Sequence, residues 1–395
     1  PGNSPSASSP RFRFACSGGP TTTRAGSEYA PRVVNGRAIV GCMTGTSLDG
    51  LDAALVRVVG RGLGLRARVE RTASRPLGEL GVRLRSLASG GSQTACEIAA
   101  MSRDLALLHA EAALEAARGT PIDLVAAHGQ TVFHAPPLSW QLLNGAVLAR
   151  AVRAPVVFDL RAADLAAGGQ GAPITPIADA ILFGDPGERR SVVNLGGFCN
   201  VTRLPRVESV SDALGAIEAA DVCACNHLLD AAARAALDAP FDAEGAAASR
   251  GRPVARVVGA LAARLESQRA SGRSLGTGDE CAAVIAELSG DAGPDDLCRS
   301  VCEAVARVVA SAVGSCDRAL VAGGGARNRA LVGAIAARLG VPAETTEAHG
   351  VGVGDREAAA MAVLGALCDD GVPITLPHVT GCARPAPVAG CRVTP

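Results

Sequence analysis

The sequence contains no lysine. All 38 basic side chains among its 395 residues are arginine, and they are balanced by 38 acidic side chains. Without lysine, the chain has no P-loop lysine to bind phosphates and no amine side chain to form a Schiff base. P-loop kinases, protein kinases and pyridoxal enzymes are therefore excluded. The lack of lysine, with abundant Ala, Gly and Arg, is also typical of biased genomic composition, and the exclusion holds for either cause.

Aromatic residues are scarce, and the formal net charge is zero. The chain has seven Phe, one Tyr and one Trp, and its pI is near 7.3. This balance gives no electrostatic reason for nucleic acid or an anionic membrane as a partner. No run approaches about 18 strongly apolar residues, so no transmembrane helix is expected. Apolar residues still make up 48% of the chain, which predicts a folded globular protein. With no electrostatic reason for a polyanionic partner, we expect small-molecule chemistry.

Thirteen cysteines are scattered along the chain, without the dense, even spacing of a secreted disulfide scaffold. We expect them to be mostly reduced and buried. One group of residues could form a metal site, namely Cys223, Cys225, His227, Cys298 and Cys302. Those spacings match no common zinc pattern, so we favour small buried hydrophobic residues over metal ligands.

Residues 1–37 differ in composition from the rest. Ser, Thr, Pro and Gly dominate, and five arginines accompany a single acid, Glu28. This composition predicts a disordered leader or an organellar transit sequence. A mis-assigned gene start is the alternative interpretation.

Two strand–turn–strand units predict a duplicated α/β domain with a cleft between the copies. The first has strands at 38–43 and 51–59, and the second begins at Ser191 with a turn at Gly196-Gly197. Further strands are expected at 122–127, 155–158, 214–219 and 319–322, and helices at 96–118, 228–237 and 328–339.

The tip of the first hairpin has the composition of a phosphate-binding turn. It reads Gly45-Thr46-Ser47-Leu48-Asp49-Gly50-Leu51-Asp52. Glycine lets the backbone approach a phosphate closely, and neighbouring N–H groups form an anion nest. Asp49 and Asp52 can hold magnesium, directly or through water. An ordinary turn is the alternative, but the density of glycine, hydroxyl and carboxylate favours a nucleotide site.

Two later segments have similar features. Gly323, Gly324 and Gly325 stand between a predicted strand and a helix that starts near Asn328, where backbone leaves room for a ligand and a helix N-terminus favours anions. The polar, glycine-rich stretch 159–173 follows another strand, as a cleft-lining loop would. The alternatives are a tight strand-to-helix turn and a long surface connection.

These three strings and a fourth, 128–136 (His-Gly-Gln-Thr-Val-Phe-His-Ala-Pro), closely resemble the anhydro-N-acetylmuramic acid kinase family. The resemblance runs from Gly41 to the end and includes the stretches 194–202 and 376–381. It implies an α/β fold of the actin-like, sugar-kinase and Hsp70 type, in which two ribonuclease-H-like domains flank a nucleotide and substrate cleft. Domain I would comprise 38–188 plus 355–395, and domain II 189–354.

The resemblance also implies an activity. Members of the family hydrolyse the 1,6-anhydro ring of anhydro-N-acetylmuramic acid and phosphorylate its O6 with ATP and magnesium. The product, N-acetylmuramic acid 6-phosphate, belongs to peptidoglycan recycling. The chain would then be a cytoplasmic enzyme, a homodimer by resemblance, with an amino sugar and ATP as small-molecule partners. Residues 1–37 leave organellar targeting open.

Matching the family's strings assigns roles to single residues. Asp221 matches the general base, and at the predicted end of a strand it can take a proton from the water that attacks C1. Glu357 matches a glutamate near the substrate in a Met-Glu-Ala string. Arg161 suits the lactyl carboxylate because guanidinium binds carboxylate bidentately. His128 is a candidate substrate contact. A structural salt bridge for Arg161 and Glu357, and a satisfied buried histidine for His128, stay open.

The sequence departs from the family's pattern at two places. The string Asp-Thr-Gly-Pro-Gly-Asn stands here as 221–226, without either glycine, and Lys-Ser-Thr-Gly-Arg-Glu stands as 275–280, with an acid in place of Arg. Fewer glycines hinder close approach of phosphate, and lost positive charge weakens anion binding. These departures favour an alternative, a catalytically impaired member that binds sugar or nucleotide without turnover.

Overall fold

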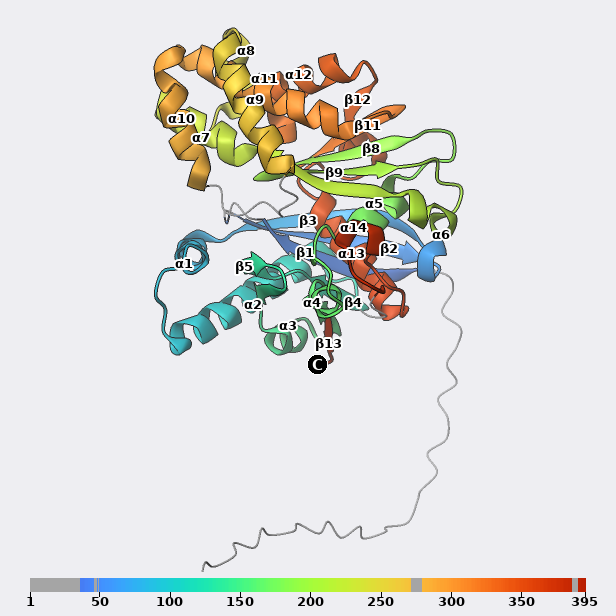
Figure 1. Cartoon of the computed structure of the whole chain (residues 1–395). Helices are drawn as coiled ribbons and strands as arrows, with labels where there is room; N and C mark the ends of the chain where they lie inside the picture. Colours follow the sequence, from blue (N-terminus) through green and yellow to red (C-terminus); the bar gives the residue numbers. More distant parts are fainter. Residues whose placement is uncertain (1–35, 46–47, 49, 271–278, 386–389) are drawn as a thin grey trace, which may run out of the picture. The chain divides into compact units, whose positions relative to one another are not determined.

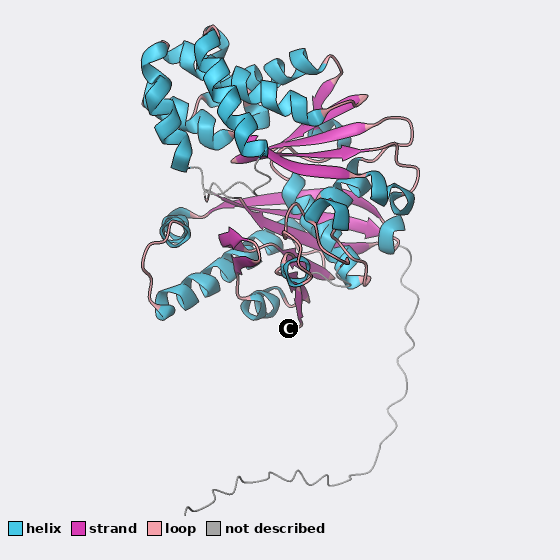
Figure 2. Cartoon of the chain, in the orientation of Figure 1, coloured by secondary structure: helices cyan, strands magenta, loops and turns pink. Residues whose placement is uncertain are grey.

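Two open sheets contain most of the strands in the computed structural model (Figures 1 and 2), which describes residues 36–45, 48, 50–270, 279–385 and 390–395. The first sheet is formed by β1 (Arg37–Thr44), β2 (Gly50–Val59), β3 (Arg66–Pro76), β4 (Leu124–Ala127), β7 (Val156–Phe158) and β13 (Cys391–Val393). The second is formed by β8 (Arg190–Leu195), β9 (Phe198–Leu204), β10 (Glu218–Ala224), β11 (Arg318–Ala322) and β12 (Ala343–Thr345). A separate hairpin joins β5 (Gln130–Ala135) and β6 (Leu138–Leu142).

The two large sheets share a five-stranded topology, to which β13 adds one antiparallel edge strand in the first sheet. The first has the order β13-β7-β4-β1-β2-β3, and the second has the order β10-β9-β8-β11-β12. In each, the first three strands along the chain pair antiparallel, and the next two add parallel on the other side of the first strand. This repeat confirms the predicted duplication and defines two ribonuclease-H-like halves. The domain boundaries at 188/189 and 354/355 stay a prediction.

Helices cover the sheets and connect the parallel strands. Their bounds are α1 (Gly78–Ala88), α2 (Ala95–Ala117), α3 (Gly145–Val152), α4 (Ala162–Ala166), α5 (Pro176–Phe183), α6 (Val210–Ala213), α7 (Asn226–Leu237), α8 (Ala246–Arg250), α9 (Ala255–Ala270), α10 (Asp279–Leu288), α11 (Pro294–Val313), α12 (Arg329–Leu339), α13 (Arg356–Asp369) and α14 (Pro377–Thr380). The longest, α2, begins with a capping box in which Thr94 and Glu97 satisfy each other's backbone N–H groups.

Alternate residues of β1 face two different cores, as the two-residue period of a strand requires. Val40 and Cys42 pack in the core that includes α2, whereas Ile39 packs in the core that includes α13. Gly41 is needed where α13 crosses the strand, because a Cβ there would lie 1.9 Å from the carbonyl oxygen of Ala358. Helix α13 is thereby held directly against β1.

One core is shared by the two halves. It contains Ile39 of the first sheet and Val192 and Leu320 of the second, together with side chains of α5 and α13. Helix α5 contacts α13 and strands of both sheets, so these two helices form the junction between the halves (Figure 1).

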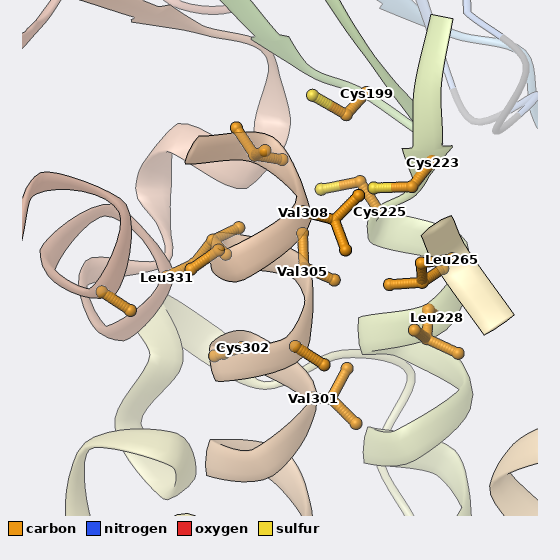
Figure 3. Close-up of a cluster of buried hydrophobic side chains, with 14 of the residues drawn as sticks. Cys199, Cys223, Cys225, Leu228, Leu265, Val301, Cys302, Val305, Val308 and Leu331 are labelled. Atoms are coloured by element: carbon orange, nitrogen blue, oxygen red, sulfur yellow. The ribbon is translucent and has the colours of Figure 1, made fainter. Parts of the chain in front are cut away.

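The second half has its own core around α11, and several cysteines fill it. Cys199, Cys223, Cys225 and Cys302 pack with Val305 and its apolar neighbours (Figure 3). Burial raises the pKa of Cys223 and of Cys302 to about 12. The expectation of buried cysteines is confirmed for this group, and of the other cysteines among the described residues only Cys96 and Cys391 are exposed.

The strand predicted at 214–219 begins later than expected. Residues Leu214–Ala216 form a 3₁₀ turn, and β10 begins at Glu218. Asp221 therefore lies within the strand and not at its end. The apolar residues before Glu218 do not form the strand because they pack elsewhere; Ile217, for example, is buried in the core shared by the two halves.

Two further expectations concern the N-terminal leader and membrane-spanning helices. Residues 1–35 of the expected leader lie outside the described residues, and β1 already begins at Arg37. Of the helices that the structure describes, none combines the length and the apolar character needed to cross a membrane.

Candidate active site

A cavity of about 1140 Å³ is lined by loops and strand ends of both halves. Most of the predicted site residues line it, namely Gly45, Gly50, Asp52, His128, Arg161, Asp221, Gly323, Gly324, Gly325, Asn328 and Glu357. Thr46, Ser47 and Asp49 lie outside the described residues, as do residues 275–278 of the second departing string. The sequence therefore brings most of its separate strings together at one place.

Leu48 and Leu51 differ from the expectation of nucleotide contact. Both side chains pack in the core beneath the β1–β2 hairpin. The N–H of Leu48 donates to the Gly45 carbonyl at 3.2 Å, and Leu51 pairs with Thr44 in the sheet. These residues shape the hairpin, and their apolar side chains are buried beneath it. Asp52, one residue further, lines the cavity and accepts a hydrogen bond of 2.5 Å from the Ser74 hydroxyl.

The glycine-rich turn after β11 needs glycine for a physical reason. Gly323 has φ of +84°, and a Cβ there would meet the backbone of Leu195 at 2.7 Å. Its N–H donates to the Val353 carbonyl at 2.7 Å. The Asn328 side chain caps α12 by accepting from the Leu331 N–H at 3.0 Å, so this side chain is committed to the helix. The turn offers backbone to a ligand, as the sequence predicts for three glycines.

Asp221 lies beside a β-bulge. The pairing of β10 with β9 shifts register between Asp221 and Cys223, which leaves Val222 as the extra residue. A bulge turns the following side chains and bends the strand. Val222 and Cys223 are buried, whereas Asp221 lines the cavity. The turn that follows is held in place because the Cys225 and Asn226 N–H groups donate to the Gly197 and Gly196 carbonyls at 2.9 and 3.0 Å.

His128 lines the cavity and is hydrogen-bonded through both ring nitrogens, and its contact with a substrate stays a prediction. Arg161 donates from Nε to His128 Nε2 at 2.9 Å, so that nitrogen must be the acceptor. The proton is then on Nδ1, which donates to the Gly129 carbonyl at 3.0 Å. Burial, and next the nearby Arg161 charge, lower the pKa of His128 to about 3. His128 is thus a neutral imidazole that orients Arg161.

Arg161 is held on one side and open on the other. Besides its bond to His128, it donates from Nη1 to the Gly171 carbonyl at 2.6 Å. Within the part of the chain that the structure describes, these bonds leave Nη2 available to the cavity. Burial lowers the pKa of Arg161, and the charges of Asp221 and Glu357 oppose that effect. Arg161 therefore interacts electrostatically with the two acids that sequence matching selects.

Glu357 lies in the first turn of α13 and accepts from the Asn194 side chain at 3.3 Å. Burial raises the pKa of Glu357, and the charges of Arg356 and Arg161 oppose the rise. The neighbouring Asp355 also lines the cavity, and burial, followed by repulsion from Asp52, raises its pKa. Asp355 is a site residue that the sequence reasoning missed, although it stands two residues before the matched Glu357.

His134 is a second residue that was not selected. It lines the cavity, and its Nδ1 lies 2.8 Å from the Ser139 hydroxyl. Its Nε2 is buried and has no partner among the described residues. Burial lowers the pKa of His134 to about 4, so the ring is neutral at pH 7. Its place in the string 128–136 was the signal that could have selected it.

A buried ion pair involves Arg356, which lies in the wall of the cavity. Arg356 donates from Nε to Asp179 at 2.9 Å and from Nη2 to the other oxygen of the same carboxylate, and both side chains are almost fully buried. The Thr202 hydroxyl donates to Asp179 at 2.7 Å. The pair thus joins α13, α5 and β9 at the junction of the halves. No local pattern signals it, because the two charged residues are 177 positions apart.

The cavity is acidic. The carboxylates on its wall are those of Asp52, Asp221, Asp230, Asp242, Glu244, Glu347, Asp355 and Glu357, and the guanidinium groups are those of Arg75, Arg161, Arg327 and Arg356. Arg75 and Arg356 also form ion pairs with Glu115 and Asp179. A polyanionic ligand would therefore bind with a compensating cation.

The repeated sheets, the junction helices and the cavity between glycine-bearing turns define an actin-like α/β protein with two ribonuclease-H-like halves. The family model of anhydro-N-acetylmuramic acid kinase matches residues 37–392. The chain belongs to this family.

Individual relatives agree with this assignment. The chain is 34% identical over 394 residues to "Anhydro-N-acetylmuramic acid kinase" of Salinibacter ruber, covering 90% of this chain and 96% of the relative. It is 38% identical over 383 residues to the protein of the same name in Bordetella pertussis, covering 92% and 98%. Among solved structures, component A of an Acidaminococcus fermentans (R)-2-hydroxyglutaryl-CoA dehydratase aligns with a TM-score of 0.47 at 14% identity, over 84% of this chain and 98% of that one. A likeness of that size carries no argument about activity.

Proposed function

We propose that the protein opens the 1,6-anhydro ring of anhydro-N-acetylmuramic acid with water and phosphorylates O6 with ATP, giving N-acetylmuramic acid 6-phosphate and ADP. The observation that carries the proposal is the meeting of Asp221, Arg161 and Glu357 in one cavity with two glycine-bearing turns. By resemblance, the reaction belongs to peptidoglycan recycling in the cytoplasm.

Asp221 is the proposed general base. It takes one proton from the water as the water oxygen bonds to C1, and the C1–O6 bond breaks. O6 then bonds to the γ-phosphorus while the bond from that phosphorus to the β-phosphate oxygen breaks, and ADP leaves. The proton on Asp221 passes to solvent. The bulge at Asp221 supports this role because it turns the carboxylate to the cavity while Val222 and Cys223 stay buried.

Arg161 is the proposed partner of the lactyl carboxylate of the sugar. Its Nε and Nη1 are fixed by His128 and Gly171, so the guanidinium plane is oriented before substrate binds. Such preorganisation lowers the entropy cost of binding. Glu357 lines the same cavity and is electrostatically coupled to Arg161, so by resemblance it would contact the sugar ring.

ATP and Mg²⁺ are the proposed cofactors. The backbone at Gly45, Gly50 and Gly323–Gly325 would approach the phosphates. The carboxylates of Asp52 and Asp355 fit a divalent cation, since they lie close enough to repel each other in an already acidic cavity. Among the described residues, no group of three potential ligands is arranged to hold a metal, and Asp49, the other predicted ligand, lies outside them. Bound Mg²⁺ would neutralise charge on the phosphates.

The alternative function is binding of sugar or nucleotide without turnover. The replaced glycines of the string 221–226 motivate it. Ala224 and Cys225, which replace the glycines, and the neighbouring Cys223 are buried in the α11 core and do not line the cavity; Figure 3 labels the two cysteines. Their side chains therefore leave the approach to Asp221 open, which favours the active enzyme over the impaired one.

The test is coupled ADP release with anhydro-N-acetylmuramic acid, with N-acetylglucosamine as the control sugar. We expect turnover with the anhydro sugar only. Asp221→Asn should lower kcat by at least roughly 100-fold, the usual scale of general-base catalysis, with the unfolding midpoint unchanged. Binding of the anhydro sugar without any ADP release would favour the impaired alternative, and full activity of Asp221→Asn would remove Asp221 as the base.

A further inference from the structure

The segment that follows α13 connects the two sides of the cavity. It contains α14 (Pro377–Thr380), which packs against β10, the strand that carries Asp221. The His378 imidazole lies 2.7 Å from the carbonyl of Ile217, four residues before Asp221. Because a carbonyl can only accept, Nε2 of His378 is the donor. The same short helix also contacts the loop that holds Arg161.

Thr380 binds that loop through a buried carboxylate. Its hydroxyl donates to Asp164 Oδ1 at 2.7 Å, whereas the Leu376 carbonyl lies further away, at 3.3 Å. Asp164 Oδ2 accepts from the Gly171 N–H at 2.7 Å, and the Gln170 N–H donates to the Thr380 carbonyl at 2.8 Å. Thr380 and Asp164 have no exposed surface. The hydroxyl therefore makes its short, charge-assisted bond in a place that water does not reach.

The chain of contacts ends at the guanidinium group. Gly171, whose N–H is held by Asp164, accepts from Arg161 Nη1 through its own carbonyl at 2.6 Å. Gly171 has φ of +67°, a conformation that suits glycine. The position of this peptide, together with His128, therefore determines where Arg161 places its Nη2.

We propose that Thr380 is a positioning residue for sugar binding, which acts through Asp164 and Gly171 to hold Arg161 opposite Asp221. This inference rests on the proposed function. Loss of the hydroxyl removes the short bond to Asp164 Oδ1 and leaves the weaker Cys382 thiol beside that carboxylate, which then turns toward other donors. The Gly171 peptide then moves, and Arg161 Nη2 loses the orientation from which it would donate to the carboxylate of the sugar.

Thr380→Val is the test, because valine keeps the shape of threonine and removes the hydroxyl. We expect KM for anhydro-N-acetylmuramic acid to rise by roughly 10-fold or more, since small misplacements of a binding group are costly. KM for ATP should change by less than about 2-fold, because the nucleotide turns lie elsewhere. Thr380→Ser retains the hydroxyl and should restore the sugar KM.

Ser300→Ala is the matched control. Ser300 is equally buried, donates to the Asp296 carbonyl at 2.7 Å and accepts from the Val254 N–H at 2.9 Å, in α11 and away from Arg161. The Ser300→Ala variant should lower the unfolding midpoint as Thr380→Val does, and it should leave the KM values for the sugar and for ATP unchanged. Equal changes of sugar KM in both variants, or an unchanged KM in Thr380→Val, would overturn the proposal.

Amide hydrogen exchange separates this proposal from the function on which it rests. Exchange in residues 165–171 should quicken in Thr380→Val and not in Ser300→Ala, whether or not the wild-type protein turns over the sugar. Quicker exchange with an inactive wild type would reject the proposed function and keep the positioning contact. Unchanged exchange would reject the contact itself.

Discussion

The buried pair of Arg356 and Asp179 gives a prediction whose size follows from burial. Arg356→Met, which puts Met at the position it has in the family's Met-Glu-Ala string, removes the guanidinium and leaves Asp179 as an enclosed charge. Arg356 is 1% exposed and Asp179 is 0% exposed. Breaking a buried pair in this way costs about 3–5 kcal/mol, because the remaining charge has lost its partner and stays away from water. The Thr202 hydroxyl at 2.7 Å compensates only partly.

Urea denaturation measures the effect in a double-mutant cycle of four proteins: the wild type, Arg356→Met, Asp179→Asn and the double variant. We expect Arg356→Met to lower the free energy of unfolding by about 3–5 kcal/mol. Arg356→Met combined with Asp179→Asn should be more stable than Arg356→Met alone, because the introduced carboxamide is neutral and still accepts from Thr202. Arg250→Met is the control, since its pair with Asp295 is exposed and its loss should leave the free energy of unfolding nearly unchanged. If the stability losses of the two single variants sum to the loss of the double variant within about 0.5 kcal/mol, the two residues are not coupled and the reasoning is refuted.

Two further predictions concern protons and thiols. The unfolded chain protonates histidine near pH 6.5, whereas burial keeps His109 and His128 neutral until about pH 4 and about pH 3. The unfolded state therefore binds more protons in this window, and stability falls as pH decreases from 6.5. Each buried histidine contributes up to about 1.4 kcal/mol per pH unit to this decline. His128→Gln should therefore make the decline of the free energy of unfolding, measured by urea denaturation, shallower by up to that amount; an unchanged slope would contradict the assignment. At pH 8, Cys96 and Cys391 should react with an aromatic disulfide reagent, while Cys223 and Cys302 react only on unfolding, which peptide mapping would check.

Local sequence patterns predicted the parts of the fold that depend on neighbouring residues. The β1–β2 hairpin and the glycine-rich turn after β11 were found because a strand period and positive-φ glycines are written in adjacent residues. The start of β10 was missed because Ile217 is claimed by the core between the halves. The bulge at Asp221 depends on its partner strand, which a single strand's sequence does not specify.

The site was predictable to the extent that its strings are contiguous. Asp221, Arg161 and Glu357 line one cavity, as matching them to the family suggested. The function of His128 in orienting Arg161 follows only from which nitrogen accepts, and this requires coordinates. The Arg356–Asp179 pair and the Thr380–Asp164 contact join residues far apart in the chain, so no spacing rule reveals them.

The two equivalent hairpins have a thermodynamic consequence. Gly45 and Gly50 come from one half and Gly196 and Gly197 from the other, yet all line the same cavity. A ligand bound there links the halves and adds stability only to their assembled form, by about 2.7 kcal/mol when its concentration is 100 times Kd. Linkage also acts in reverse. A substitution that loosens the α5–α13 junction, without touching the ligand, will be measured as a loss of affinity.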